Sequence, residues 1–321
     1  MRDPALAALE SPLRRGERRW LVPLAFGLVY VIWGSTYLAI KFAIETIPPF
    51  LMAGSRFLVA GGVLYAAARL LGAPRPAKSE WAPASLVGLF LLLGGNGLVV
   101  FGQKTVPSGL ASLLVAGVAL WMALFEALRP GGKWPSKPVA LGLIGGFAGV
   151  GLLIGPRNGG AVDAVGAAAI VGATISWALG SIYARGARLP KSAFIATAVE
   201  MMAGGAALLA LGFATGQAGQ LHLAAITAKS LIAVAYLAVF GSIVAFTAYV
   251  WLLSVRPPSL VATYAYVNPV VAVMLGSIFA GEDLTARMIV AAGVIVASVA
   301  VITTFSSPRP VAVSAPAAET P

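Results

Sequence analysis

The chain has 321 residues, of which 59% are hydrophobic and only 10% are charged, and its net charge is +11. A soluble domain carries about 25% charged residues, so this chain cannot cover a water-facing surface, and lipid is the solvent that fits. It has no cysteine, and its single histidine, His222, lies in a polar connection, so we expect no disulfide, no metal site and no cofactor.

Ten apolar segments follow one another along the chain, each about long enough to cross a bilayer as a helix. Pro and Gly punctuate most connections, as at Pro48-Pro49 and Pro257-Pro258. The first segment is too long for a signal peptide and lacks a convincing cleavage site, so we expect it to be retained. We predict an all-α membrane protein with spans at about 21–41, 49–71, 83–102, 108–128, 138–155, 164–184, 193–214, 230–254, 258–280 and 286–305.

Basic residues are unequally distributed between the two sides of the membrane if the N-terminus is cytoplasmic and successive spans cross in opposite directions. On this topology 16 of the 22 basic residues lie on the inside, as the positive-inside rule predicts. The outer side and outer helix ends receive only Lys41, Arg56, Lys104, Arg157, Lys229 and Arg287. We therefore place both termini in the cytoplasm and expect the tails 1–19 and 306–321 to be disordered. The positive charge is then a topology signal, and we expect no nucleic-acid partner.

Short motifs recur in the same order at offsets of about 145–150 residues. The matching segments are Trp33-Gly34-Ser35-Thr36-Tyr37 with Trp177 and Gly180-Ser181-Ile182-Tyr183, Ala60-Gly61-Gly62 with Ala203-Gly204-Gly205, and Pro107-Ser108 with Pro258-Ser259. We predict two repeats, at 20–156 and 163–305, of five spans each. Because five is odd, the two repeats would enter the membrane in opposite directions, which is typical of transporters that alternate between inward-open and outward-open states.

The same motifs resemble the EamA-type exporters of the drug/metabolite transporter superfamily. The matching segments are Trp33 to Lys41, Arg56-Phe57, Asn268-Pro269 and Gly281-Glu282. The resemblance covers about residues 20–305 and implies a ten-helix fold with a central cavity, and export of amino acids, related metabolites or amphiphilic drugs across a bacterial inner membrane. One departure is Ala119, where such proteins often carry a proline, so a kink in the fourth span is in doubt.

Charged residues within the spans are candidates for function, because each costs about 2.5–3.5 kcal/mol to insert. Glu200, about two turns into its span, is the candidate for proton coupling, and a structural partner within the bundle is the alternative. Arg56 is placed to bind a substrate carboxylate through its forked guanidinium; an Arg that holds backbone carbonyls is the alternative. Lys41, at the outer end of the first span, is expected to snorkel, and a role in substrate binding is the alternative.

Polar and aromatic residues complete the predicted substrate site. Asn96 lies in a glycine-rich stretch, and Asn268 precedes Pro269, which should kink its helix. The aromatic candidates for cavity walls, which could stack on a cation or an apolar group, are Trp33, Tyr37, Trp121, Trp177, Tyr183 and Tyr264. Packing in the core is the alternative for all of them.

The leading interpretation is a secondary transporter with a small-molecule substrate and the lipid bilayer as its surroundings. The chain lacks a GxxxxGK[ST] motif, so we do not expect it to hydrolyse ATP. A passive facilitator or channel is the alternative, and a membrane enzyme is disfavoured because no convergent catalytic set is visible. Glycines in the span 138–155 allow either close packing within the monomer or a homodimer face.

Overall fold

The computed structural model describes residues 20–128, 134–154, 163–255, 261 and 264–305. These residues form helices and short connections, and no β-strand occurs among them. The helices of the first half are α2 (Leu21–Ala43), α3 (Pro49–Leu70), α4 (Lys78–Gly88), the π-helix η1 (Leu89–Asn96), α5 (Gly97–Gly102), α6 (Ser108–Ala116), α7 (Val118–Leu128) and α8 (Lys137–Ile154).

The second half is built of α-helices with short 3-10 and π-helical segments. Its helices are α9 (Ala164–Ala184), α10 (Ala193–Ala214), the 3-10 helices η2 (Gln217–Gln220) and η3 (Leu223–Ala225), α11 (Ala228–Tyr236), the π-helix η4 (Leu237–Val244), α12 (Ala245–Val255), α14 (Tyr264–Ala280) and α15 (Ala286–Phe305). The predicted N- and C-terminal tails and the start of the span 258–280 lie outside the described residues.

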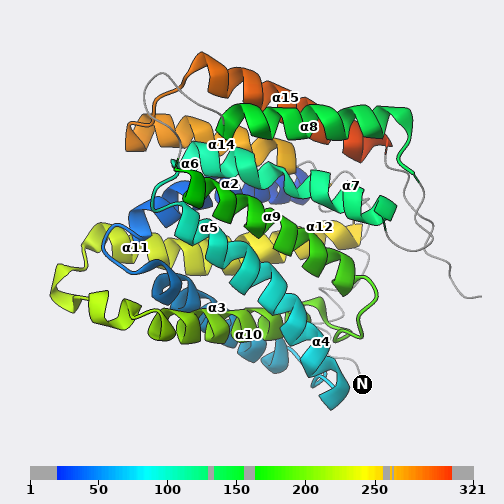
Figure 1. Cartoon of the computed structure of the whole chain (residues 1–321). Helices are drawn as coiled ribbons and strands as arrows, with labels where there is room; N and C mark the ends of the chain where they lie inside the picture. Colours follow the sequence, from blue (N-terminus) through cyan, green and yellow to red (C-terminus); the bar gives the residue numbers. More distant parts are fainter. Residues whose placement is uncertain (1–19, 129–133, 155–162, 256–260, 262–263, 306–321) are drawn as a thin grey trace, which may run out of the picture.

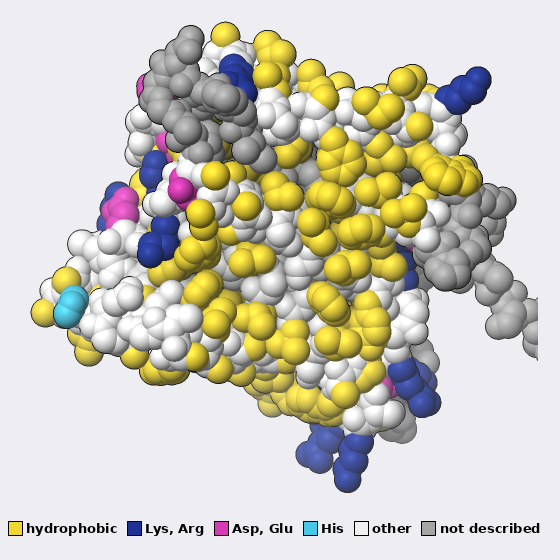
Figure 2. Space-filling model, viewed as in Figure 1, with side chains coloured by type: hydrophobic (Ala, Val, Ile, Leu, Met, Phe, Trp, Pro, Cys, Tyr) yellow, Lys and Arg dark blue, Asp and Glu magenta, His cyan; other side chains and the backbone are white. Residues whose placement is uncertain are grey.

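Seven described helical stretches are long and apolar enough to cross a membrane, and three further apolar helices are shorter. Hydrophobic side chains cover the middle of the face in Figure 2, whereas the charged side chains gather towards its two ends. This distribution suits a bilayer, because the hydrocarbon layer accepts apolar side chains and the headgroup regions accept charges.

Three of the long helical rods change their backbone hydrogen bonding midway. The third rod of each half contains an eight-residue π-helix, η1 in the first half and η4 in the second. In the fourth rod, α6 and α7 are separated at Gly117, although no proline is present there. The sequence left this break in doubt; the structure places it two residues before Ala119 and shows that glycine alone accompanies it.

Helices at equivalent places in the two halves pack directly against each other. A Cβ atom at Gly54 of α3 would lie 2.7 Å from Leu209 of α10, and one at Gly61 would lie 2.9 Å from the carbonyl oxygen of Ala198. The contact moves backwards along α10 as it moves forwards along α3, so the two helices are antiparallel. Small residues permit this close approach of two backbones.

The pair α8 and α15 repeats the arrangement at the opposite edge of the bundle (Figure 1). A Cβ atom at Gly142 would lie 2.9 Å from Ile302, and one at Gly149 would lie 2.8 Å from Ile295, so this pair is also antiparallel. Both glycines of α8 therefore serve packing within the monomer, which is one of the two interpretations that the sequence left open.

Candidate functional site

An aromatic cluster joins α2, α12 and α14 in the interior of the bundle. Trp33 of α2 lies with its ring centroid 5.1 Å from Tyr249 of α12 and 5.0 Å from Tyr264 of α14, and the two tyrosine rings are 5.8 Å apart. These distances and the tilted or edge-to-face angles are those of attractive aromatic pairs. Two predicted site residues, Trp33 and Tyr264, thus lie together, and Tyr249 joins them.

Asn268 fastens α14 to α2 at the edge of this cluster. With its amide nitrogen turned towards the backbone, it donates hydrogen bonds of 3.2 Å to the carbonyl oxygens of Tyr30 and Tyr264, an orientation assigned from the hydrogen-bonding pattern. The helix continues through Pro269, which has no N–H to donate to the preceding turn. One turn beyond Trp33, Tyr37 is partly buried and packs against a core cluster of α6, α8 and α15.

Each mid-helix tryptophan contacts the π-helix of the opposite half. The indole Nε1–H of Trp33 donates a 3.1 Å hydrogen bond to the carbonyl oxygen of Gly241 in η4. Trp177 of α9 packs over Gly95 in η1, where a Cβ atom would lie 2.8 Å from its ring. The wide turns of the π-helices therefore lie where the two halves of the chain meet. Such turns within helices occur frequently at functional sites.

Arg56 and Asn96 form a second group between α3 and η1. The side chain of Arg56 is 5% exposed, donates a 3.3 Å hydrogen bond to Oδ1 of Asn96 and stacks over the ring of Phe57 at 4.0 Å. Its Nε–H has no hydrogen-bond partner, and no described carboxylate forms an ion pair with it. A buried guanidinium with spare donors can accept an anionic group.

Glu200 lies on α10, with its backbone against Gly88 of α4. Its side chain is partly buried, and none of the described Lys or Arg residues forms an ion pair with it. Trp121 of α7 faces α8, where its ring contacts Phe147, and Tyr183 is exposed near the end of α9. The predicted site residues therefore fall into separate groups, and the aromatic cluster and the Arg56–Asn96 pair are the two that bring several together.

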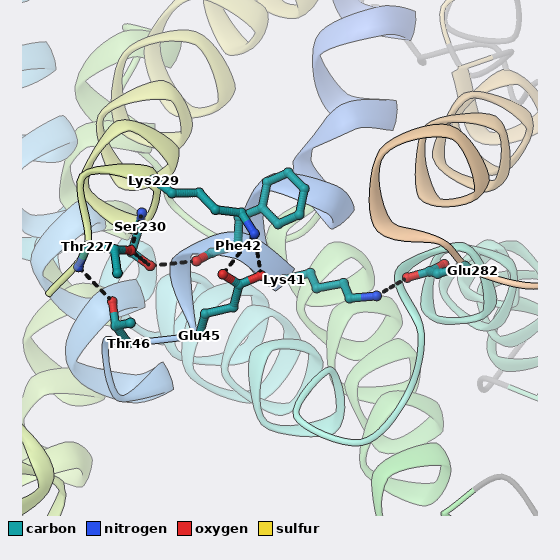
Figure 3. Close-up of polar contacts among 8 residues, drawn as sticks. All are labelled: Lys41, Phe42, Glu45, Thr46, Thr227, Lys229, Ser230 and Glu282. Carbon is teal, nitrogen blue, oxygen red and sulfur yellow. Dashed lines mark hydrogen bonds and ion pairs between the residues drawn. The ribbon is translucent and has the colours of Figure 1, made fainter. Parts of the chain in front are cut away.

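A buried ionic group that was not predicted from the sequence lies at the end of α2. The carboxylate of Glu282, in the connection between α14 and α15, accepts hydrogen bonds from the Lys41 ammonium at 2.9 Å, the Ser108 N–H at 2.7 Å, the Ser108 hydroxyl at 2.8 Å and the Gly109 N–H at 2.9 Å. We call Glu282, Lys41, Ser108 and Gly109 the Glu282 node. Figure 3 shows Lys41 reaching across to Glu282.

The node forms because of two local features. Gly281 follows α14 with φ of 61°, a conformation that glycine adopts without strain, and turns the chain so that Glu282 points at the start of α6. The first N–H groups of α6 have no partner within the helix, and a carboxylate satisfies them. Burial raises the pKa of Glu282, but the hydrogen bonds from Gly109, Lys41 and Ser108 outweigh it and hold that pKa below its ordinary value.

A sequence signal for this node existed. The Gly281-Glu282 pair follows an apolar segment, and Pro107-Ser108 marks the start of a helix. What the sequence could not supply was the pairing, because Lys41 and Glu282 are separated by 241 residues. Lys41 is therefore an ion-pair partner rather than the snorkelling residue that we predicted.

Comparison with known proteins decides the family. The EamA-like transporter family matches residues 20–155 and 164–304, which together make up most of the chain. The chain belongs to the EamA-like transporter family. A relative described as the uncharacterized inner membrane transporter YedA of Escherichia coli K12 is 41% identical over 290 residues, which cover 89% of this chain and 92% of the relative.

Two other relatives of this EamA-like transporter differ in how much they cover. The uncharacterized transporter YvbV of Bacillus subtilis is 28% identical over 88% of this chain and 92% of its own. A probable amino-acid metabolite efflux pump of Escherichia coli K12 is 28% identical over 49% of this chain and 50% of its own. The protein is thus a multi-pass inner-membrane transporter of the drug/metabolite superfamily, not an enzyme.

A solved structure, described only as a crystal structure of a protein, shares the fold of this EamA-like transporter. It superposes with a TM-score of 0.62 over 90% of this chain and 99% of that chain, at 21% sequence identity. At this identity the likeness concerns the fold alone.

Proposed function

We propose that this EamA-like transporter exports amino acids or related small metabolites by alternating access between two inverted five-helix repeats, at 20–156 and 163–305, with both termini in the cytoplasm. The observation that carries the proposal is the reciprocal packing of the halves. α3 lies antiparallel to α10 and α8 to α15, while Trp33 and Trp177 each contact the π-helix of the opposite half. Two related halves joined in this way can rock about their interface.

The substrate would bind between the two groups already described. The aromatic cluster offers ring faces to an ammonium group or an apolar side chain, and the buried Arg56 with Asn96 offers donors to a carboxylate. An ammonium and a carboxylate together describe an amino acid, and one relative that matches this chain over about half of its length is described as a probable amino-acid metabolite efflux pump, which agrees with that class. Tyr37, Trp121, Trp177, Tyr183 and Asn268 remain predicted contacts.

A passive facilitator is the alternative, and uphill transport would exclude it. A homodimer also remains a prediction. It would have to use a surface other than Gly142 and Gly149 of α8, which face α15 within the chain.

The proposal is tested by uptake of a labelled amino-acid panel into proteoliposomes, with and without an imposed pH gradient. Saturable uptake above equilibrium only in the presence of the gradient would support a proton-coupled transporter. Uptake that equilibrates regardless of the gradient would support a facilitator, and no uptake of any amino acid would reject the substrate class.

Glu200→Gln tests the coupling residue on the same preparation. We expect this variant to lose the response to the pH gradient but to retain exchange of labelled for unlabelled substrate, because the amide cannot carry a proton through the cycle. Glu45→Gln, which removes an exposed carboxylate at the end of α2, should leave the response intact. An unchanged gradient response in Glu200→Gln would remove Glu200 from this role.

A further inference from the structure

The two ends of the helix bundle are fastened unequally in the part of the chain that the structure describes. At one end, the Glu282 carboxylate receives four hydrogen bonds and is 7% exposed. At the other end, Arg185 and Glu126 lie 3.4 Å apart, with side chains 57% and 34% exposed. The buried group is the stronger fastening, since exposed ion pairs contribute little to stability.

The two fastenings occupy related places. Lys41 follows Trp33 by eight residues, and Arg185 follows Trp177 by eight residues. Each cation lies at the end of the first helix of one half, and each pairs with an acid at the end of the fourth helix of the other half. Opposite ends of the molecule therefore carry ion pairs at related positions, one buried and one exposed.

We propose that the Glu282 node is a latch that holds its end of the bundle closed, and that it must separate once in each transport cycle. The inference rests on the proposed alternating access, in which each end opens in turn. The node joins α2 and α6 of the first half to the α14–α15 connection of the second, so this end cannot open while the node is intact. On the proposed topology it lies at the outer face.

A second ion pair at the same end provides a control. Lys229 at the start of α11 binds Glu45 beyond the end of α2 at 2.7 Å and lies over the ring of Phe42 (Figure 3). The side chains of Lys229 and Glu45 are 50% and 40% exposed, so water can replace their contact readily when they separate. Glu45→Gln thus removes an acid of the same type at the same end without breaking a buried network.

The reporter is a single cysteine at Ser112, since the chain has none of its own. Ser112 is 1% exposed and lies one turn after Ser108, on the same face of α6. Ser112→Cys is placed in the full-length protein in proteoliposomes, and its reaction with a small, charged, membrane-impermeant thiol reagent is followed without substrate. The reaction should be slow while the latch is closed.

Glu282→Gln is expected to raise the labelling rate about tenfold, because the amide replaces one of the two acceptor oxygens with an NH2 donor and removes the charge that pairs with Lys41. Lys41→Met should raise it to a smaller extent, because the helix N–H groups remain bound. Lys41→Met also provides the test if Glu282→Gln does not fold. Glu45→Gln should leave the labelling rate unchanged.

Unchanged labelling in both node variants, or an equal rise in Glu45→Gln, would overturn the latch. Substrate uptake is measured on the same vesicles, so the two ideas fail separately. Faster labelling without uptake of any amino acid would uphold the latch and reject the substrate class. Normal uptake of an amino acid with unchanged labelling in the node variants would uphold the substrate class and reject the latch.

Discussion

At the scale of single residues, the buried Arg56 is the most informative side chain. A guanidinium has five N–H donors, yet its only described hydrogen bond goes to Asn96, and its Nε–H has no partner. A buried charge without a counter-ion is costly, and a residue that only held the fold would be expected to have its donors satisfied. This imbalance favours a ligand carboxylate as the missing partner.

Arg56→Leu should therefore weaken transport of substrates that carry a free carboxylate. We expect the apparent KM to rise about tenfold or more, because a charge-assisted hydrogen bond contributes roughly 1.5–3 kcal/mol. The measurement compares an amino acid with its amide in the same vesicles. Equal losses for both compounds would show that Arg56 supports the structure only.

The Glu282 node should make the stability of the protein depend on acidic pH. Because the folded pKa of Glu282 lies below its ordinary value of 4.5, the unfolded chain binds the proton first as the pH falls. The stabilisation is complete above that value and is lost as the pH drops through the lower, folded pKa.

Thermal unfolding in detergent from pH 7 down to pH 3, of the natural chain and of Glu282→Gln, measures this effect. The difference in Tm between them should shrink below about pH 4.5. The comparison is needed because the pKa of Asp163 is also lowered, by hydrogen bonds from Gly166 and Thr105. A difference that stays constant over this range would contradict the assignment.

At the scale of elements, hydropathy predicted the bounds of a helix well where residues that favour helix ends, such as proline and glycine, lie at the same positions. The predicted span 49–71 corresponds to α3, which begins with Pro49 at its first turn and is followed by Gly72 at φ of 85°. The predicted start at residue 83 was five residues late. α4 begins at Lys78, in a polar first turn where Glu80 accepts a hydrogen bond from the Ala77 N–H.

The π-helices could not have been predicted from composition. Segments 89–96 and 237–244 are apolar, as a regular span would be, and only the backbone hydrogen-bond register distinguishes them. Gly95 permits the close approach of Trp177 from the other half, and the carbonyl oxygen of Gly241 accepts the hydrogen bond from Trp33. Such long-range contacts leave no local pattern in the sequence, whereas the glycines themselves were visible.

Adjacent glycines on α3 give a matched test of helix packing. A Cβ atom at Gly61 would lie 2.9 Å from the carbonyl oxygen of Ala198, whereas one at Gly62 would meet nothing within 4 Å. Gly61→Ala should destabilise the protein by about 1–3 kcal/mol, since the helices must move apart. Gly62→Ala should be neutral or stabilising by up to about 1 kcal/mol. Chemical or thermal unfolding measures both, and equal effects would contradict the α3–α10 contact.

At the scale of the whole molecule, the sequence supported a helical membrane transporter more securely than a particular binding site. Composition and repeated motifs are spread over the whole chain, so an error in the bounds of one helix hardly changes the prediction of the fold class. A site depends on which faces of distant helices meet, and Trp121 illustrates the difficulty. It is a mid-span aromatic like Trp33, yet it packs towards α8 rather than towards the aromatic cluster.

The backbone contact between α3 and α10 has a mechanical consequence. At Gly54 and Gly61, α3 contributes no side chain and lies directly against backbone and side-chain atoms of α10, so this contact leaves little room for one helix to tilt against the other. If the halves rock, this line is the pivot, and displacement grows with distance from it. The aromatic cluster and the Glu282 node are built on other helices, away from this pivot. A small rotation of the two halves about the glycines would then move the residues of each group apart by a larger distance.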